Sequence, residues 1–186
     1  FSEQVEWLQS EKKLVIDDKK RAEDILQRIG YFSLIGGYKY LFRVPLTKKY
    51  KENTSFEEIY SLYLFDGELR ELFFKYLLQI ERHLRSLISY YFSELYGESQ
   101  SAYLNIDNFN DNGRNHKTIL RLISTLTRAV KTTDYDYINY YRKTYDNIPL
   151  WVLSNVLTFG NLSKMYQVSS QSLQSRICKN IKAQEN

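Results

Sequence analysis

The sequence predicts an all-α protein, a helical bundle built around one long central helix with a small N-terminal helical extension. Only 7 Gly and 2 Pro occur in 186 residues, so the chain has few residues that break helices or form tight turns. Apolar side chains recur at helical spacing along most of the chain, and no useful length of sequence alternates as a strand does. The 17 Tyr and 10 Phe residues supply large rings that suit a packed helical core.

The predicted N-terminal helical extension covers residues 1–50. Residues 2–13 have the spacing of a short amphipathic helix. Asp17 or Asp18 can cap a second helix, because a short acidic side chain accepts hydrogen bonds from the free N–H groups of a first turn. That helix is predicted to stop at Gly30.

Two breaks follow in this part of the chain. The Gly36-Gly37 pair marks a bend or a close backbone approach. A helix crossing is favoured over a phosphate-binding loop, because the strand-to-helix glycine pattern of such loops is missing. The polar, basic segment RVPLTKKYKENT at 43–54 is the best candidate for a domain boundary, which leaves residues 51–186 as the helical bundle.

The central helix of the bundle has a clear predicted start. Ser55 followed by Glu58 is a capping box, in which each side chain bonds the backbone N–H of the other residue. Helical spacing then continues to Gly97, and the Asp66-Gly67 pair is a possible kink or break. From Gly67 to Gly97 the helix would have about eight turns, which is long for an ordinary globular domain.

The remaining helices are predicted to be shorter. Residues 114–133 form an amphipathic helix, and a second helix after Asp134 is rich in tyrosine. Pro149 is predicted to start a helix that ends at Gly160, because proline is tolerated in a first turn. Two further helices, through NLSKMYQ and SLQSRICKNIKAQ, complete the bundle.

Composition excludes several classes of protein. The single cysteine, Cys178, rules out an internal disulfide framework and a multi-cysteine zinc site, and it favours a reducing, cytoplasmic setting. No apolar run approaches the roughly 20 residues of a membrane-spanning helix, so we expect no membrane partner. The net charge of +4 permits an RNA partner without requiring one.

One candidate site lies on the central helix, where Glu81, His83 and Arg85 are close in sequence. Glu81 and Arg85 are four residues apart in the order that favours an ion pair. His83 lies about 200° around the helix from Glu81, so one helix cannot make the two an acid–base pair. The three side chains therefore either line an RNA cleft together with another helix, or form a structural ion pair beside a solvated histidine. On these residues alone, the structural interpretation is favoured.

A second candidate site is a basic stripe on the 114–133 helix. Cationic side chains recur on one face of it, opposite an apolar face. Such a stripe can neutralise RNA phosphates, but it is also the ordinary outer face of an amphipathic helix, which we favour because interleaved aromatic residues are absent. The candidate RNA-binding residues are Arg114, Lys117, Arg121, Arg128 and Lys131.

The tyrosine-rich segment that follows allows two interpretations. Tyr137, Tyr141 and Tyr145 are spaced as one helical stripe. They could stack on RNA bases, or they could seal the edge of the bundle as part of its core. The helical spacing favours the core.

Three separated blocks of the sequence resemble the Abi-like abortive-infection family (the AbiD/AbiF type). They are IGYFSLIGGYKYL at 29–41, the long block from TSFEEIYSLYLFDGELR to YYFSELYG at 54–97, and IPLWVLSNVLTFGNLSKMY at 148–166. The resemblance covers about residues 17–178. Because the blocks occur in the family's order, they are specific for the family and less so for a mechanism.

This resemblance implies a bacterial phage-defence protein related to the HEPN superfamily of helical ribonucleases, and therefore a HEPN-like bundle. It implies an RNA-cleaving toxin that needs neither metal nor cofactor, because RNA supplies its own 2′-hydroxyl nucleophile. A histidine then moves the proton and an arginine stabilises the phosphate. The implied partners are RNA, an antitoxin and a second copy of the chain.

The superfamily motif R-N-x-x-x-H is not present in residues 1–186. The chain starts with Phe1 rather than Met, so we expect the natural protein to be longer. We also expect it to continue past Asn186 into a last helix that carries this motif. The catalytic residues are unknown on this basis. The alternative function is a non-catalytic module that binds RNA or protein.

Overall fold

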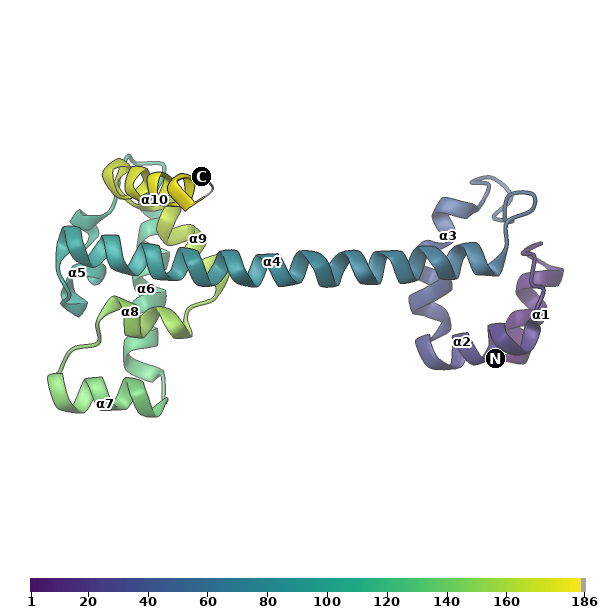
Figure 1. The fold of residues 1–186 in the computed structure, drawn as a ribbon, viewed down its shortest axis with the longest axis horizontal. Helices are drawn as coiled ribbons and strands as arrows, with labels where there is room; N and C mark the ends of the chain where they lie inside the picture. Colours follow the sequence, from purple (N-terminus) through teal and green to yellow (C-terminus); the bar gives the residue numbers. More distant parts are fainter. Residues whose placement is uncertain (185–186) are drawn as a thin grey trace. The chain divides into compact units, whose positions relative to one another are not determined.

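The computed structural model describes residues 1–184, and within them the predicted all-α class is confirmed. Helices make up most of these residues, which contain two isolated β-bridges but no strand. The chain forms two compact units, Phe1–Lys75 and Tyr76–Asn186. The long helix α4, Phe56–Tyr96, contributes residues to both (Figure 1). Of the helices described, none is both long and apolar enough to cross a membrane.

The first unit contains α1 (Ser2–Ser10), α2 (Lys19–Ile29), a π-helical turn η1 (Phe32–Gly36), α3 (Gly37–Phe42) and the start of α4. Asp18 caps α2 as predicted, since its side chain accepts a hydrogen bond of 2.9 Å from the Arg21 N–H. Gly30 ends α2 at a φ of 90°, which favours glycine. The Gly36-Gly37 pair lies where η1 passes into α3, so the chain continues in helical form there.

The first unit has its own apolar core, and the loop at 43–54 is fixed to it. The Tyr50 N–H donates to the Lys12 carbonyl and the Lys51 N–H to the Phe42 carbonyl, each at 2.9 Å. The loop where the sequence predicted a boundary between 1–50 and 51–186 therefore lies within this unit. The buried core residues are Val5, Leu8, Leu14, Ile16, Ala22, Ile25, Leu26, Leu34, Ile35, Tyr50, Phe56 and Ile59.

Local capping defines both ends of α4. The capping box is confirmed: the Ser55 N–H donates to Glu58 Oε2 at 2.7 Å, and the Glu58 N–H donates to Ser55 Oγ at 3.2 Å. At the other end Gly97 has a φ of 91°, and its N–H donates to the Ser93 carbonyl at 2.8 Å. The possible break at Asp66-Gly67 does not occur, because α4 remains helical through it for 41 residues in all.

Short helices surround the C-terminal part of α4 in the second unit. In Figure 1, α10 lies on one side of α4, and α8 and α7 lie on the other. The elements are α5 (Gln100–Leu104), η2 (Ile106–Asn108), α6 (His116–Thr132), α7 (Asp136–Tyr145), α8 (Leu150–Leu153), η3 (Ser154–Val156), α9 (Phe159–Val168) and α10 (Gln171–Gln184).

The prediction of a single helix from Pro149 to Gly160 is wrong. The chain instead forms the four-residue α8, the 3₁₀ turn η3 and then the start of α9. The reason is a local cap: Thr158 Oγ1 accepts a hydrogen bond of 3.3 Å from the Asn161 N–H, which starts α9 before the glycine. Gly160 is therefore in the first turn of a helix rather than after the end of one.

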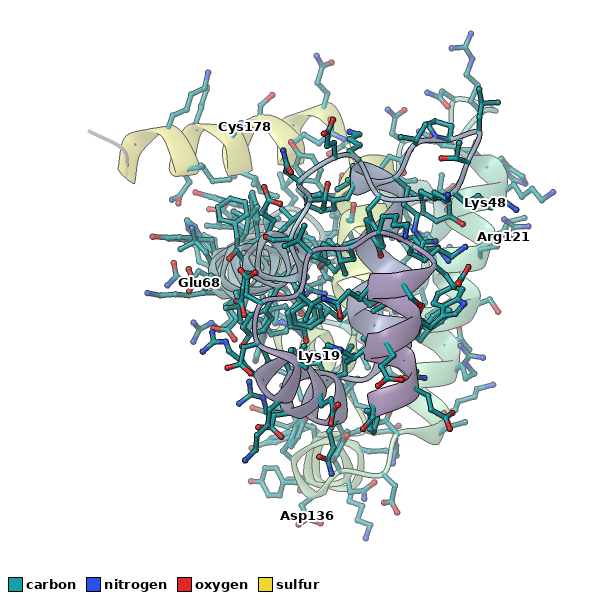
Figure 2. All side chains as sticks on the ribbon, turned by 90° about the vertical axis from the view of Figure 1, so that its right-hand side faces the viewer. Lys19, Lys48, Glu68, Arg121, Asp136 and Cys178 are labelled. Carbon is teal, nitrogen blue, oxygen red and sulfur yellow. The ribbon has the colours of Figure 1, made fainter. Side chains whose placement is uncertain are left out.

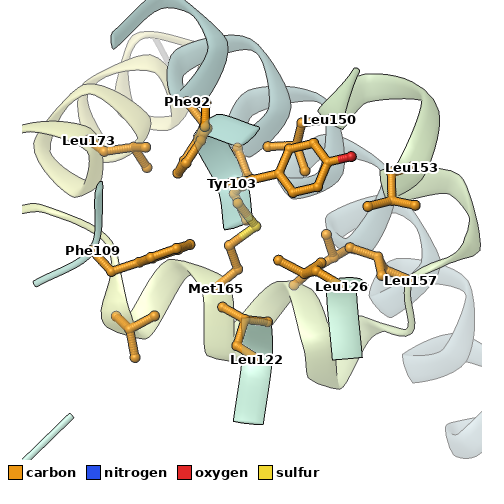
Figure 3. Packing of buried hydrophobic residues seen from close by; sticks show 14 of the residues in the cluster. Phe92, Tyr103, Phe109, Leu122, Leu126, Leu150, Leu153, Leu157, Met165 and Leu173 are labelled. Atoms are coloured by element: carbon orange, nitrogen blue, oxygen red, sulfur yellow. The ribbon is translucent and has the colours of Figure 1, made fainter. Parts of the chain in front are cut away.

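Met165 of α9 lies at the centre of the apolar core of the second unit. Figure 3 shows it between rings contributed by α5 and the loop after η2, and leucines contributed by α6. The labelled neighbours include Tyr103, Phe109, Leu122 and Leu126, all buried. Helices from α4 to α10 contribute to this core, so a single apolar cluster holds the second unit together.

Tyr103 is the largest polar side chain inside this core. Its hydroxyl donates to the Ile148 carbonyl at 2.6 Å, and burial raises the pKa of its phenol above the usual value. We expect Tyr103→Phe to lower the free energy of unfolding by about 1–2 kcal/mol, because a buried carbonyl loses its partner. Urea unfolding followed by Trp151 fluorescence measures this in a Trp7→Phe background, since Trp7 belongs to the first unit. Tyr137→Phe, on an exposed ring, is the control, and an equal loss in both variants would contradict the prediction.

The predicted tyrosine core of α7 is wrong for two of its three members. Tyr137 and Tyr145 are 42% and 59% exposed, and Tyr141 is half-buried. Ile138 is the buried residue of α7. The rings pair with one another instead, as Tyr135 and Tyr137 do in a stack with centroids 5.7 Å apart. A tyrosine carries a polar end, so helical spacing alone does not place its ring inside.

Candidate nucleic-acid interface

A basic groove of about 520 Å³ lies against α6 and α9. Three residues of the predicted stripe, Lys117, Arg121 and Arg128, line it from α6, and Lys164 of α9 joins them. Figure 2 labels Arg121, one of the exposed cations of α6. Neutral side chains complete the lining: Leu120, Ser124 and Thr125.

The amphipathic pattern of α6 determines which side chains reach this groove. Ile119, Leu122 and Leu126 are buried and turn one face of the helix into the core. The cations of the stripe occur on the remaining face and stay exposed. Helices α6 and α9 are in contact, so Lys164 lies on the neighbouring wall.

The charges of the groove are not neutralised within the described part of the chain. Its four cations take part in none of the ion pairs found among residues 1–184. Four positive side chains around one open groove favour an anionic partner with repeated charges, as in the phosphates of a nucleic acid. A single small anion would need convergent donors rather than an extended row.

The other two members of the predicted stripe lie outside this groove. Lys131 is exposed in the last turn of α6, and Arg114 is exposed just before the helix begins at His116. Neither residue is part of the groove lining. The structure therefore brings together three of the five predicted cations and adds Lys164 to them.

An acid–histidine pair occurs where α6 begins. His116 Nδ1 and Asp111 Oδ2 are 2.5 Å apart, and the Gly113 N–H donates to Asp111 Oδ1 at 3.1 Å. The hydrogen bond with His116, aided by that of Gly113, holds the pKa of the Asp111 carboxyl below its usual value. Both side chains are substantially exposed, so the pair shapes the loop before α6 rather than forming an enclosed site.

A second groove of about 520 Å³ lies between α4 and the α8–η3 segment. Residues 82, 85, 86, 89 and 90 contribute from α4, at the spacing of one helical face. Trp151, Ser154 and Asn155 contribute from the other wall. The lining therefore combines aromatic rings, hydroxyls, an amide and two guanidinium groups.

Arg85 joins the two walls of this second groove. Its guanidinium donates to the carbonyls of Ser154 and Leu157, the latter at 3.2 Å, and forms an ion pair with Glu81. The Arg85 and Glu81 side chains are only 16% and 23% exposed. A planar guanidinium can satisfy several acceptors at once, so Arg85 holds the η3 turn against α4.

The three predicted cleft residues therefore occupy different surroundings. Arg85 is in the groove wall and Glu81 is bound to it, which is the pair expected from their spacing. His83 is half-buried and is not part of the groove lining. Of the residues described, no group of three or more His, Cys, Asp or Glu side chains is placed to hold a metal ion.

Sequence reasoning missed Lys164, Ser89 and Trp151. Lys164 is a lone cation on a short helix, and only the packing of α9 beside α6 gives it basic neighbours. Ser89 belongs to a row of serines on one face of α4, with Ser86 and Ser93. The spacing of that row was a usable signal, although no sequence pattern placed Trp151 opposite it.

Neither the curated proteins nor the solved structures include a significant match to this chain. The family model described as Abi-like protein matches residues 24–186, which is most of the chain and includes both grooves. The chain therefore belongs to the Abi-like protein family, which implies a bacterial abortive-infection protein.

Proposed function

We propose that this protein acts in abortive infection by binding RNA, and that the basic groove between α6 and α9 receives the phosphates. The observation that carries the proposal is the placement of four cations, Lys117, Arg121, Arg128 and Lys164, along one open groove. None of these cations is paired with an acidic residue in the described part of the chain. Each is therefore available to replace a counterion on a phosphate.

Single-stranded RNA suits this surface better than a folded protein partner. Three of the four cations lie along one helix, spread over about three turns from residue 117 to 128. A flexible strand can follow such a row phosphate by phosphate. The groove is also poor in apolar side chains, with Leu120 the only one in its lining, whereas the centre of a protein interface is rich in them.

Cleavage of the bound RNA is the finer part of the proposal. In the HEPN-related proteins that the sequence resembles, it would depend on an R-N-x-x-x-H motif, which residues 1–186 do not contain. The alternative is a module that binds RNA without cleaving it. Incubation of the protein with labelled RNA separates the two, because a nuclease shortens the strand and a binding module returns it intact.

The salt dependence of binding tests the proposed contact. Four phosphate contacts predict that the logarithm of the association constant falls with the logarithm of salt at a slope of about −2.8. Affinity for a short fluorescein-labelled single-stranded RNA should then drop about 50-fold between about 50 and 200 mM salt. Fluorescence anisotropy measures it, and an affinity independent of salt would contradict phosphate binding.

A further inference from the structure

We infer that the groove between α4 and the α8–η3 segment is a nucleotide-binding site, distinct from the basic groove between α6 and α9. It would hold one nucleotide unit, with the base beside Trp151 and Tyr90 and the phosphate near Arg82. The inference rests on the proposed RNA function and adds a second contact to it, one that recognises a base rather than only the backbone.

The hydroxyl of Ser89 is the first reason. Ser89 is 2% exposed and lines the groove, yet its Oγ has no hydrogen-bond partner among the described residues. Most buried hydroxyls are paired, because leaving a polar atom buried without a partner is unfavourable. The hydroxyl is covered in the empty groove, so a ligand donor or acceptor would complete its hydrogen bonding once the Ser89 side chain rotates toward the groove.

The two rings of the groove are the second reason. Trp151 is 39% exposed and Tyr90 is 62% exposed, although both side chains are large and partly apolar. The Tyr90 ring is held by an edge-on contact with Tyr91, with ring centroids 5.1 Å apart. Exposed rings held in place are what nucleic-acid-binding proteins use to stack an unpaired base.

The polar groups of the groove fit the rest of a nucleotide. Arg82 is exposed and makes no ion pair with another described residue, so its charge is available to a phosphate. Asn155 uses its amide nitrogen on the Trp151 carbonyl at 2.9 Å, which leaves the amide oxygen to accept from a base. Arg85 is occupied by Glu81 and two carbonyls, so it positions the wall rather than binding the ligand. The volume of about 520 Å³ is in the range of small-ligand sites.

A titration with adenosine 5′-monophosphate tests the inference in a Trp7→Phe background. Trp151 is then the only tryptophan, because the chain contains 2. We expect saturable quenching of its fluorescence, together with a smaller response to adenosine and none to inorganic phosphate. No response to the nucleotide would overturn the inference, and so would an equal response to phosphate alone.

Two serine variants provide a matched pair for this titration. Ser89→Ala should weaken nucleotide binding about fivefold through one lost hydrogen bond. Ser93→Ala is the control, because Ser93 Oγ is also buried and unpartnered on α4 but is not part of the groove lining. Equal affinities for the two variants would contradict the assignment of Ser89.

RNA binding by the same variants separates this inference from the proposed function. If RNA binds but Ser89→Ala changes neither the affinity nor the Trp151 signal, the nucleotide site is wrong and the basic groove stands. If the nucleotide binds and RNA does not, the proposed function is wrong and the groove is a site for a free nucleotide. If the nucleotide and RNA both quench Trp151, and Ser89→Ala weakens the binding of each, the groove binds a nucleotide unit of RNA.

Discussion

Replacing Lys117 and Arg121 by glutamate is expected to weaken the binding of single-stranded RNA by about 100-fold or more at low salt. The change removes two of the four cations of the basic groove and places two carboxylates beside the strand. Each lost phosphate contact lowers the affinity, and each new carboxylate repels the backbone. The slope against salt should fall from about −2.8 to about −1.4, because two contacts remain.

A charge-matched control makes this result specific to the groove. Lys179→Glu with Lys182→Glu on α10 changes the net charge by the same amount at exposed positions of the same unit, outside the groove lining. We expect this control to weaken binding only slightly. If both double variants lose affinity equally, RNA binding depends on net charge alone, and the groove is not the RNA-binding site. Circular dichroism should show equal helicity in both variants.

Replacing Arg85 by alanine is expected to destabilise the second unit by about 2–4 kcal/mol, because a mostly buried ion pair loses one partner. The carbonyls of Ser154 and Leu157 lose their donor, and Glu81 remains as a poorly solvated carboxylate. Urea unfolding monitored by Trp151 in the Trp7→Phe background follows the unit that contains Arg85, because Trp151 is in that unit.

Two neighbouring variants show whether the loss comes from these contacts. Arg82→Ala removes an exposed arginine of the same helix with no ion pair among the described residues, so stability should change by less than about 0.5 kcal/mol. Arg85→Lys keeps the charge, but an ammonium lacks the planar fork that reaches several acceptors. Its loss of stability should lie between the losses of Arg82→Ala and Arg85→Ala. A stable Arg85→Ala protein would show that the guanidinium does not hold the η3 turn.

Local sequence features predicted the ends of helices well where the signal lies within a few residues. Ser55 and Glu58 start α4, and Gly97 ends it at a positive φ. The failures at Asp66-Gly67 and Gly160 have the same origin. A glycine permits a break in a helix but does not require one. Gly67 lies inside α4, and Gly160 lies in the first turn of α9.

The candidate sites were predicted less completely than the helices. Spacing on α6 correctly gave a basic face opposite an apolar one, and spacing on α4 gave the Glu81–Arg85 pair. Spacing did not distinguish a solvated face from the wall of a groove, because that depends on what lies opposite. Lys164 and Trp151 supply those opposite walls, and neither belongs to a recognisable motif.

The sequence by itself determined the all-α class, the main helix caps, the family and the residues of the basic face. The helix caps and the basic face depend on interactions within one or two turns. The family is recognised from sequence blocks in a fixed order along the chain. The tertiary structure alone decided what the charged residues do. The two carbonyl partners of Arg85 lie 69 and 72 residues further along the chain, and they reach it only after α4 and the η3 turn have packed together. A guanidinium can face solvent or bind a carbonyl with the same local sequence, and the choice depends on which acceptors the fold brings near it.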